Sequence, residues 1–161
     1  MTLIGAATDA GIAVTVGESP ASPGARAERV RAKAYAGAAG CILNHAGSPD
    51  DVVAFVDTIE RYELPGAPFA VFAPVPLVTN RQNALTLNTF PGLCLPPGYL
   101  DTILASPKPE EEGLRLATTL AAKLLASHRF AGLNLSGGGH RADPYDRLRM
   151  TARYIDALRS I

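Results

Sequence analysis

The stretch RAKAYAGAAGCILNHAGSPDD, residues 31–51, decides the fold that the sequence predicts. Its first part is rich in alanine, arginine and lysine, which favour a helix. The apolar run 41–44 then fits a short buried strand. Ser48-Pro49-Asp50-Asp51 is typical of a helix start, with a serine N-cap, a proline in the first turn and acids at the positive end of the helix dipole. This helix–strand–helix order indicates one unit of a parallel α/β protein.

The same alternation runs along the whole chain. Apolar and β-branched runs bounded by glycine and proline predict strands, and the segments between them predict helices. The expected strands are residues 12–16, 41–44, 69–72 and 130–135, and the expected helices are residues 25–39, 49–59, 81–87 and 110–127, a short helix after Pro97, and a last helix capped by Asp143 with Pro144 in its first turn.

This pattern predicts an α/β fold, a parallel βα repeat with four strands in sequential order. A complete TIM (β/α)₈ barrel typically takes about 250 residues, so we expect these 161 residues to form half of such a barrel. The alternative is a doubly wound, flavodoxin-like sheet with strand order 2-1-3-4. Residues 1–161 are expected to form a single domain. The first ten residues resemble the tail of a preceding helix, which leaves open whether the chain is a fragment of a longer protein.

Charge and composition narrow the function classes. Fifteen basic and fifteen acidic residues give a formal net charge of zero, which argues against nucleic acid or an anionic membrane as a partner. We expect no transmembrane helix and no secretory signal, and hence a cytoplasmic protein. The two cysteines, Cys41 and Cys94, lie in apolar runs, so we expect packing roles in a reduced compartment and no metal site.

Polar residues follow the expected strands at the ends where barrel enzymes place function. Asn44 and His45 follow the second strand, and Glu18 is the carboxylate next to the end of the first strand. We predict that these three residues bind substrate. Each also has a structural interpretation: an amide that caps a turn, a loop histidine without chemistry, and a surface acid.

The order of these features is similar to that in the methylenetetrahydrofolate reductase family. The resemblance begins with a helix that carries a lysine, an Ala-Gly-Ala string and a strand that ends in an amide, and it continues, at low identity, over nearly the whole chain. The residues that carry it are Lys33, Ala36-Gly37-Ala38, Asn44, the segment 73–80, Leu95-Pro96, Leu100, Gly113, Leu120, Leu124 and Gly132-Leu133.

The resemblance implies the C-terminal half of a (β/α)₈ barrel that transfers a hydride from NAD(P)H to a methylene-folate through FAD. Lys33 matches a family lysine that meets the phosphates of the flavin nucleotide, which makes it the cofactor-binding candidate. Asn44 takes the place of a glutamine near folate and flavin, and Asn83 matches a second glutamine at the substrate site. Asn134 stands in for a histidine on the last strand. The resemblance assigns no catalytic residue.

The chain also departs from the family pattern. Leu87 replaces an aromatic residue that stacks on nicotinamide or folate, and Arg26, Arg29 and Ala32 replace flavin contacts. The family's proton donor and its main flavin-contact aspartate lie on earlier strands, which these residues do not include. The differences argue against a conventional FAD site. We therefore expect activity to need a missing N-terminal half, a partner half-barrel or a homo-oligomer, and the alternative is a non-catalytic module that binds a folate-type molecule or a protein partner.

Overall fold

The computed structural model describes residues 2–20, 23–44, 48–65, 68–89, 95–137 and 144–159. The elements within these residues are α1 (Leu3–Asp9), β1 (Thr15–Glu18), α2 (Pro23–Tyr35), β2 (Gly40–Leu43), α3 (Pro49–Glu60), β3 (Ala70–Leu77), α4 (Arg81–Asn88), α5 (Tyr99–Ala105), α6 (Pro109–Ala126), β4 (Gly132–Gly137) and α7 (Pro144–Leu158).

The strands of the described chain form one parallel sheet in the order β1-β2-β3-β4. This order confirms the predicted sequential βα repeat and excludes the doubly wound alternative. The registers align Gly17 with Ile42, Ile42 with Phe72, and Phe72 with Gly132. These registers show which residues of neighbouring strands lie side by side.

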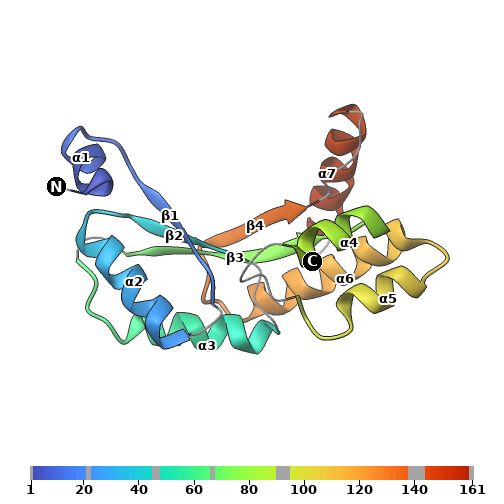
Figure 1. Cartoon of the computed structure of the whole chain (residues 1–161), viewed down its shortest axis with the longest axis horizontal. Helices are drawn as coiled ribbons and strands as arrows, with labels where there is room; N and C mark the ends of the chain where they lie inside the picture. The colour runs from blue at the N-terminus through green and yellow to red at the C-terminus, as the bar shows by residue number, and fades with distance from the viewer. Residues whose placement is uncertain are drawn as a thin grey trace.

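Helices α2, α3 and α6 cover one face of the sheet (Figure 1). The predicted serine N-cap at the start of α3 is confirmed. The structure adds a capping box, because the Ser48 hydroxyl and the Asp51 carboxylate each accept a hydrogen bond from the other's backbone N–H. Alternate residues of β3 point into the core between sheet and helices. The buried core consists of Ala27, Val30, Cys41, Leu43, Val52, Phe55, Val56, Ile59, Val71, Ala73, Val75, Leu77, Ala117, Leu120, Ala121, Leu124 and Tyr154. Cys41 thus has the packing role expected for it, whereas Cys94 lies outside the described residues.

The opposite face of the sheet carries the other set of side chains. Ile42 and Phe72 are half-buried and stand outside the core cluster, and the Phe72 ring lies close to the backbone of Gly132. Helices α1 and α7 project on this side, at opposite ends of the sheet (Figure 1). The first of them agrees with the helix tail expected in the first ten residues. Within the residues that the structure describes, this face therefore has no helical layer like the one on the other side.

All four strands differ from their predicted bounds. The second and fourth are shifted by one and two residues, to Gly40–Leu43 and Gly132–Gly137, and the larger differences are in the first and third. The first strand occupies Thr15–Glu18 instead of residues 12–16, because pairing with Gly40–Leu43 selects the later residues over the β-branched run. The third strand continues from the predicted 69–72 to Leu77, through Pro74 and Pro76. Prolines are expected only where a strand needs no N–H donor.

The two prolines face the side of β3 on which β2 has already ended. Ala70 N–H bonds to Ala39 on the β2 side and the Val71 carbonyl accepts from Ala131 on the β4 side. Because successive residues alternate between the two sides, Pro74 and Pro76 point toward β2. The β2 pairing stops at Phe72, so the missing N–H groups cost no ladder bond.

Gly113 fixes the distance between α6 and the end of β3. A Cβ atom at this position would lie 1.7 Å from the Val78 carbonyl oxygen, so only glycine allows the helix to approach so closely. This contact positions the residues that follow β3. Helix α6 has 18 residues and carries three glutamates in its first turn. No described helix is both long enough and apolar enough to cross a membrane.

Candidate functional site

Thr79 and Asn83 form a buried polar pair just beyond the end of β3. Asn80 caps α4 by accepting a hydrogen bond from Asn83 N–H at 2.9 Å, which fixes the backbone there. The Asn83 side chain donates its Nδ2 to Thr79 Oγ1 at 3.4 Å. Asn83 is only 4% exposed, and its Oδ1 is buried with no hydrogen-bond partner among the described residues. Since buried polar atoms are nearly always paired, this oxygen marks Asn83 as a ligand-binding candidate.

A second apolar cluster packs beside this pair. Its buried members are Val78, Ala84, Leu87, Tyr99 and Ile103. Tyr99 donates its hydroxyl to the Pro76 carbonyl at 2.8 Å, and burial raises the pKa of this phenol, so it stays protonated at neutral pH. Leu87 is therefore a core residue and presents no stacking surface to a ligand.

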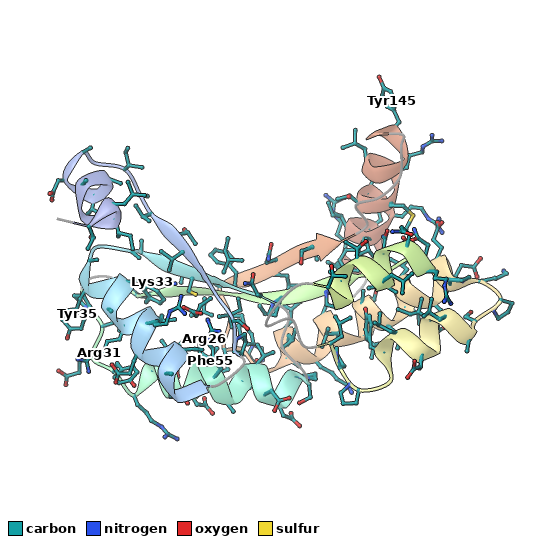
Figure 2. All side chains as sticks on the ribbon, viewed as in Figure 1. Arg26, Arg31, Lys33, Tyr35, Phe55 and Tyr145 are labelled. Carbon is teal, nitrogen blue, oxygen red and sulfur yellow. The ribbon has the colours of Figure 1, made fainter. Side chains whose placement is uncertain are left out.

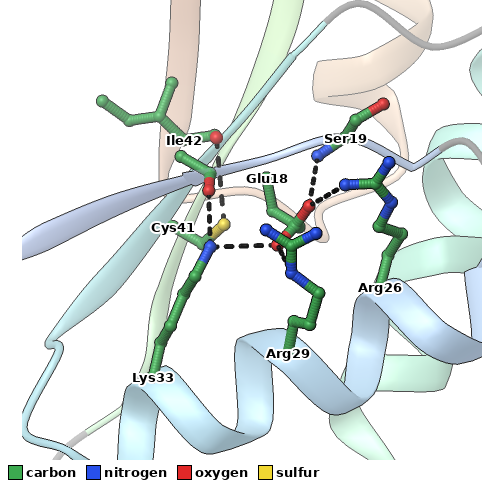
Figure 3. A network of polar contacts seen from close by, with 8 residues as sticks. Glu18, Ser19, Arg26, Arg29, Lys33, Cys41 and Ile42 are labelled. Carbon is green, nitrogen blue, oxygen red and sulfur yellow. Dashed lines mark hydrogen bonds and ion pairs between the residues drawn. The ribbon is translucent and has the colours of Figure 1, made fainter. Parts of the chain in front are cut away.

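Glu18 is the centre of a charge cluster between β1 and α2 (Figure 3). Its side chain is 2% exposed and points to the helix side of the sheet, where it pairs with Lys33 at 2.9 Å, Arg26 at 3.1 Å and Arg29 at 3.3 Å. Ser19 N–H donates a further bond to the carboxylate. Lys33 also donates to the Gly17 carbonyl at 2.8 Å.

The protonation state of Glu18 follows from these contacts. Burial alone raises the pKa of a carboxyl group, but the hydrogen bonds from Lys33, Ser19 and Arg26 outweigh burial and lower the pKa of Glu18. The carboxylate is therefore ionised at neutral pH. The Glu18 carboxylate lies against three cations on the helix side of the sheet. Its contact with substrate therefore stays a prediction from the sequence.

Asn44 and Asn134 lie on the open side of the sheet. Asn134 pairs with Pro74 in register, and it alternates with Leu133 and Leu135, which pack on the core. Asn44 directly follows the end of β2, beyond the last residue of β2 that pairs with β3. Asn44 is exposed. His45 lies outside the described residues.

The sequence-predicted candidates thus separate into three groups. Asn83 belongs to the pair at the end of β3, Asn44 and Asn134 lie on the open face, and Glu18 and Lys33 belong to the charge cluster. Sequence reasoning treated Arg26 and Arg29 only as departures from a family pattern. Their spacing with Lys33, at i, i+3 and i+7, puts all three on one helix face and could have revealed the cluster.

The residues do not fit a conventional flavin site. Leu87 is buried where the resemblance needs an aromatic ring, and the Lys33 ammonium group already bonds to Glu18 and Gly17. The binding of FAD or NAD(P)H therefore stays a prediction of the resemblance alone. Among the described residues, no group of three or more His, Cys, Asp or Glu side chains could hold a metal ion.

Comparison with solved structures finds proteins of similar fold. The sequence matches no protein-family model and no curated protein. The fold is similar to that of an uncharacterized protein from Clostridium thermocellum that binds two copies of 5-methyl-5,6,7,8-tetrahydrofolic acid, with a TM-score of 0.74 and 11% sequence identity. The match covers 100% of this chain and 60% of that chain. This likeness supports the α/β fold, and the chain spans 60% of the neighbour's length.

Proposed function

We propose that the chain binds a reduced folate and forms half of a (β/α)₈ barrel. The sequential parallel order and the helices on one face of the sheet support the barrel, because a barrel wall has this construction. The Clostridium thermocellum protein of similar fold binds 5-methyl-5,6,7,8-tetrahydrofolic acid, and this supports the ligand class.

The buried Asn83 Oδ1 is the observation that carries the proposal. It is an acceptor without a donor, and it lies just after the carboxyl end of β3, the edge where parallel α/β proteins bind ligands. A pterin ring presents N–H donors along one edge. A donor bound here would remove the cost of an unpaired buried oxygen, which is about 1–3 kcal/mol.

The amides on the open face supply a second contact in this proposal. Thr79 lies beyond the end of β3, whereas Asn134 pairs with Pro74 inside that strand. Asn44 and Asn134 therefore meet a different part of an elongated ligand than Asn83 does, and His45 follows Asn44 directly. Glu18 is the least favoured substrate contact of the set, since its carboxylate is already paired with three cations.

A more specific form of the proposal is that the protein transfers a hydride from NAD(P)H to a methylene-folate. It needs an acid and flavin contacts from further strands, supplied by a preceding half, a partner half-barrel or a second copy of the chain. A non-catalytic binding module is the second candidate. The burial of Leu87, where the resemblance needs a stacking ring, favours this second candidate.

Titration of the purified chain with 5-methyltetrahydrofolate tests the binding proposal. Asn83→Leu removes the amide and keeps the number of side-chain heavy atoms, and we expect it to weaken binding at least tenfold. The same substitution should leave the unfolding free energy unchanged or higher, because it removes an unpaired buried oxygen. Gln82→Ala, which removes an exposed amide of the same helix, is the matched control and should bind as the wild type does.

Equal affinity of wild type and Asn83→Leu would show that Asn83 does not bind the folate. Failure of the wild-type chain to bind at all would remove the proposal for this chain on its own. Addition of a complementary half-barrel would then test whether the site needs both halves.

A further inference from the structure

The side chains of Thr79 and Asn83 are held in place by packing on two sides. Val78, directly before Thr79, is fully buried, and a Cβ atom added at Gly113 of α6 would lie 3.6 Å from the Thr79 Cα atom. On the other side, the Asn80 side chain accepts the Asn83 N–H at the start of α4. Thr79 and Asn83 are only 5% and 4% exposed, and a β-branched side chain such as threonine has few rotamers. The packing therefore restricts how the two polar groups can turn.

The hydrogen bond between the two side chains decides which atom of the Asn83 amide is left for a ligand. Asn83 donates its Nδ2 to Thr79 Oγ1 at 3.4 Å. The Oδ1 atom, on the same carboxamide carbon, is then the atom without a partner among the described residues. Turning the amide over would exchange this free acceptor for a free donor. The contact with Thr79 thus sets the hydrogen-bonding character that Asn83 offers.

The Thr79 hydroxyl also has a hydrogen to donate. A hydroxyl group combines one O–H donor with two acceptor lone pairs, and the bond from Asn83 uses a lone pair. Within the part of the chain that the structure describes, this hydroxyl donates to no acceptor. Because buried polar groups are nearly always paired, the O–H group is a second unmet requirement next to the first. The pair therefore offers a ligand one acceptor and one donor, side by side.

From this arrangement we infer that Thr79 is a specificity-determining residue, which together with Asn83 selects a ligand edge where an N–H donor adjoins a carbonyl acceptor. This inference rests on the proposed folate binding and names the part of the ligand that the pair recognises. The pyrimidinone ring of a pterin has such an edge, because its N3–H group adjoins the C4 carbonyl. The N3–H group donates to Asn83 Oδ1, and the C4 carbonyl accepts from the Thr79 hydroxyl. An amino group at C4 reverses both positions, because C4 then carries a donor and N3 loses its hydrogen.

The test compares 5-methyltetrahydrofolate with its 4-amino-4-deoxy form, which differs only at this edge. Calorimetry on the wild-type chain should give at least tenfold tighter binding of the 4-oxo ligand, because the 4-amino ligand leaves both buried groups of the pair unsatisfied. Thr79→Val removes the hydroxyl and keeps the branched shape. In this variant the preference should fall to within about threefold, since the released amide can turn to suit either ligand.

Two further variants complete the comparison. Thr79→Ser keeps the hydroxyl and should keep the preference. Thr118→Val is the matched control, because the half-buried Thr118 hydroxyl bonds only to the Leu114 carbonyl of its own helix among the described residues. It should bind both ligands as the wild type does. The ratio of the two affinities is the informative quantity, since a variant that merely loosened α4 would weaken both ligands alike and leave the ratio unchanged.

Each other result overturns the inference in a recognisable way. Equal affinities of the wild type for the two ligands would leave folate binding intact and remove the selection by Thr79. A preference that survives Thr79→Val, or that disappears in Thr79→Ser, would show that the hydroxyl is not what selects. Tighter binding of the 4-amino ligand by the wild type would mean that Asn83 presents its Nδ2 instead. Failure of both ligands to bind would remove the proposed function itself, and the selection with it.

Discussion

Lys33 on α2 and Glu18 at the end of β1 form an ion pair of 2.9 Å across fifteen positions of the chain. The same ammonium group donates to the Gly17 carbonyl at 2.8 Å. One lysine thus holds both the side chain and the backbone of a four-residue edge strand. Strand β1 pairs with β2 alone among the described strands, so this contact gives it a second attachment.

Glu18→Gln should lower the unfolding free energy by roughly 2 kcal/mol, because it leaves three cations around a buried neutral amide. Urea denaturation of the two proteins measures the difference. Glu63→Gln, which changes an exposed acid, is the control and should lie within about 0.5 kcal/mol of the wild type. Equal stability of Glu18→Gln and wild type would mean that solvent already screens the repulsion among the three cations.

The stability contributed by Glu18 should depend on pH. The ordinary pKa of the group is 4.5, and its pKa in the folded protein is lower. A carboxyl group of this kind stabilises the fold above its unfolded pKa and loses that effect as pH falls through its folded pKa. We expect the unfolding free energy of the wild type to fall below pH 4.5 more steeply than that of Glu18→Gln. Parallel curves would contradict the lowered pKa.

Gly113→Ala should destabilise the protein by about 3 kcal/mol, because the new Cβ would meet the Val78 carbonyl oxygen and force α6 away from β3. Thermal unfolding followed by circular dichroism checks this. Gly24→Ala is the matched control in α2, where an added Cβ meets nothing within 4 Å. It should stabilise the helix by about 0.5–1 kcal/mol. Equal stability of the two variants would show that α6 and β3 have room for a Cβ atom at position 113.

Helix α7 should take part in association with a partner half or a second copy. Its Tyr145 and Leu148 side chains are 71% and 65% exposed, and Figure 2 shows Tyr145 at the far end of the helix, away from the sheet. Light scattering should give a mass above the 16.8 kDa of one chain at high concentration. Tyr145→Arg/Leu148→Arg should return the mass to that of one chain, with the unfolding free energy within about 0.5 kcal/mol. A wild-type chain that stays single at every concentration would argue against self-association.

The elements that depend on local chemistry could be predicted from the sequence. The start of α3 is an example, since the serine, the proline and the acids of residues 48–51 act within one turn. The alternation of strands and helices predicted a parallel sheet but left two strand orders open, and only the structure excludes the doubly wound one. The limits of β1 and β3 could not be predicted, because pairing partners elsewhere in the chain select them. Pro74 in particular is typical of a strand end. Only the early end of β2 explains why the strand can continue through it.

The candidate site was predictable only in part. Asn83 was identified through a resemblance, but the property that distinguishes it, a buried oxygen without a donor, depends on how α4 and β3 pack. Glu18 and Lys33 were expected to meet different ligands, and the structure pairs them with each other. A single sequence cannot reveal such a pair, since the two residues lie on different elements and either could as well face solvent.

The two prolines of β3 also keep other chains from pairing with the unpaired part of this strand. Beyond Phe72 no described strand pairs with the β2-facing side of β3. At Pro74 and Pro76 this side offers no amide hydrogen, and the Pro76 carbonyl is occupied by Tyr99. A stray peptide therefore finds no ladder to extend there, which protects the unpaired stretch from edge-to-edge aggregation. The proline-rich end of β3, on which the resemblance partly rests, is thus also an edge that resists pairing with another strand.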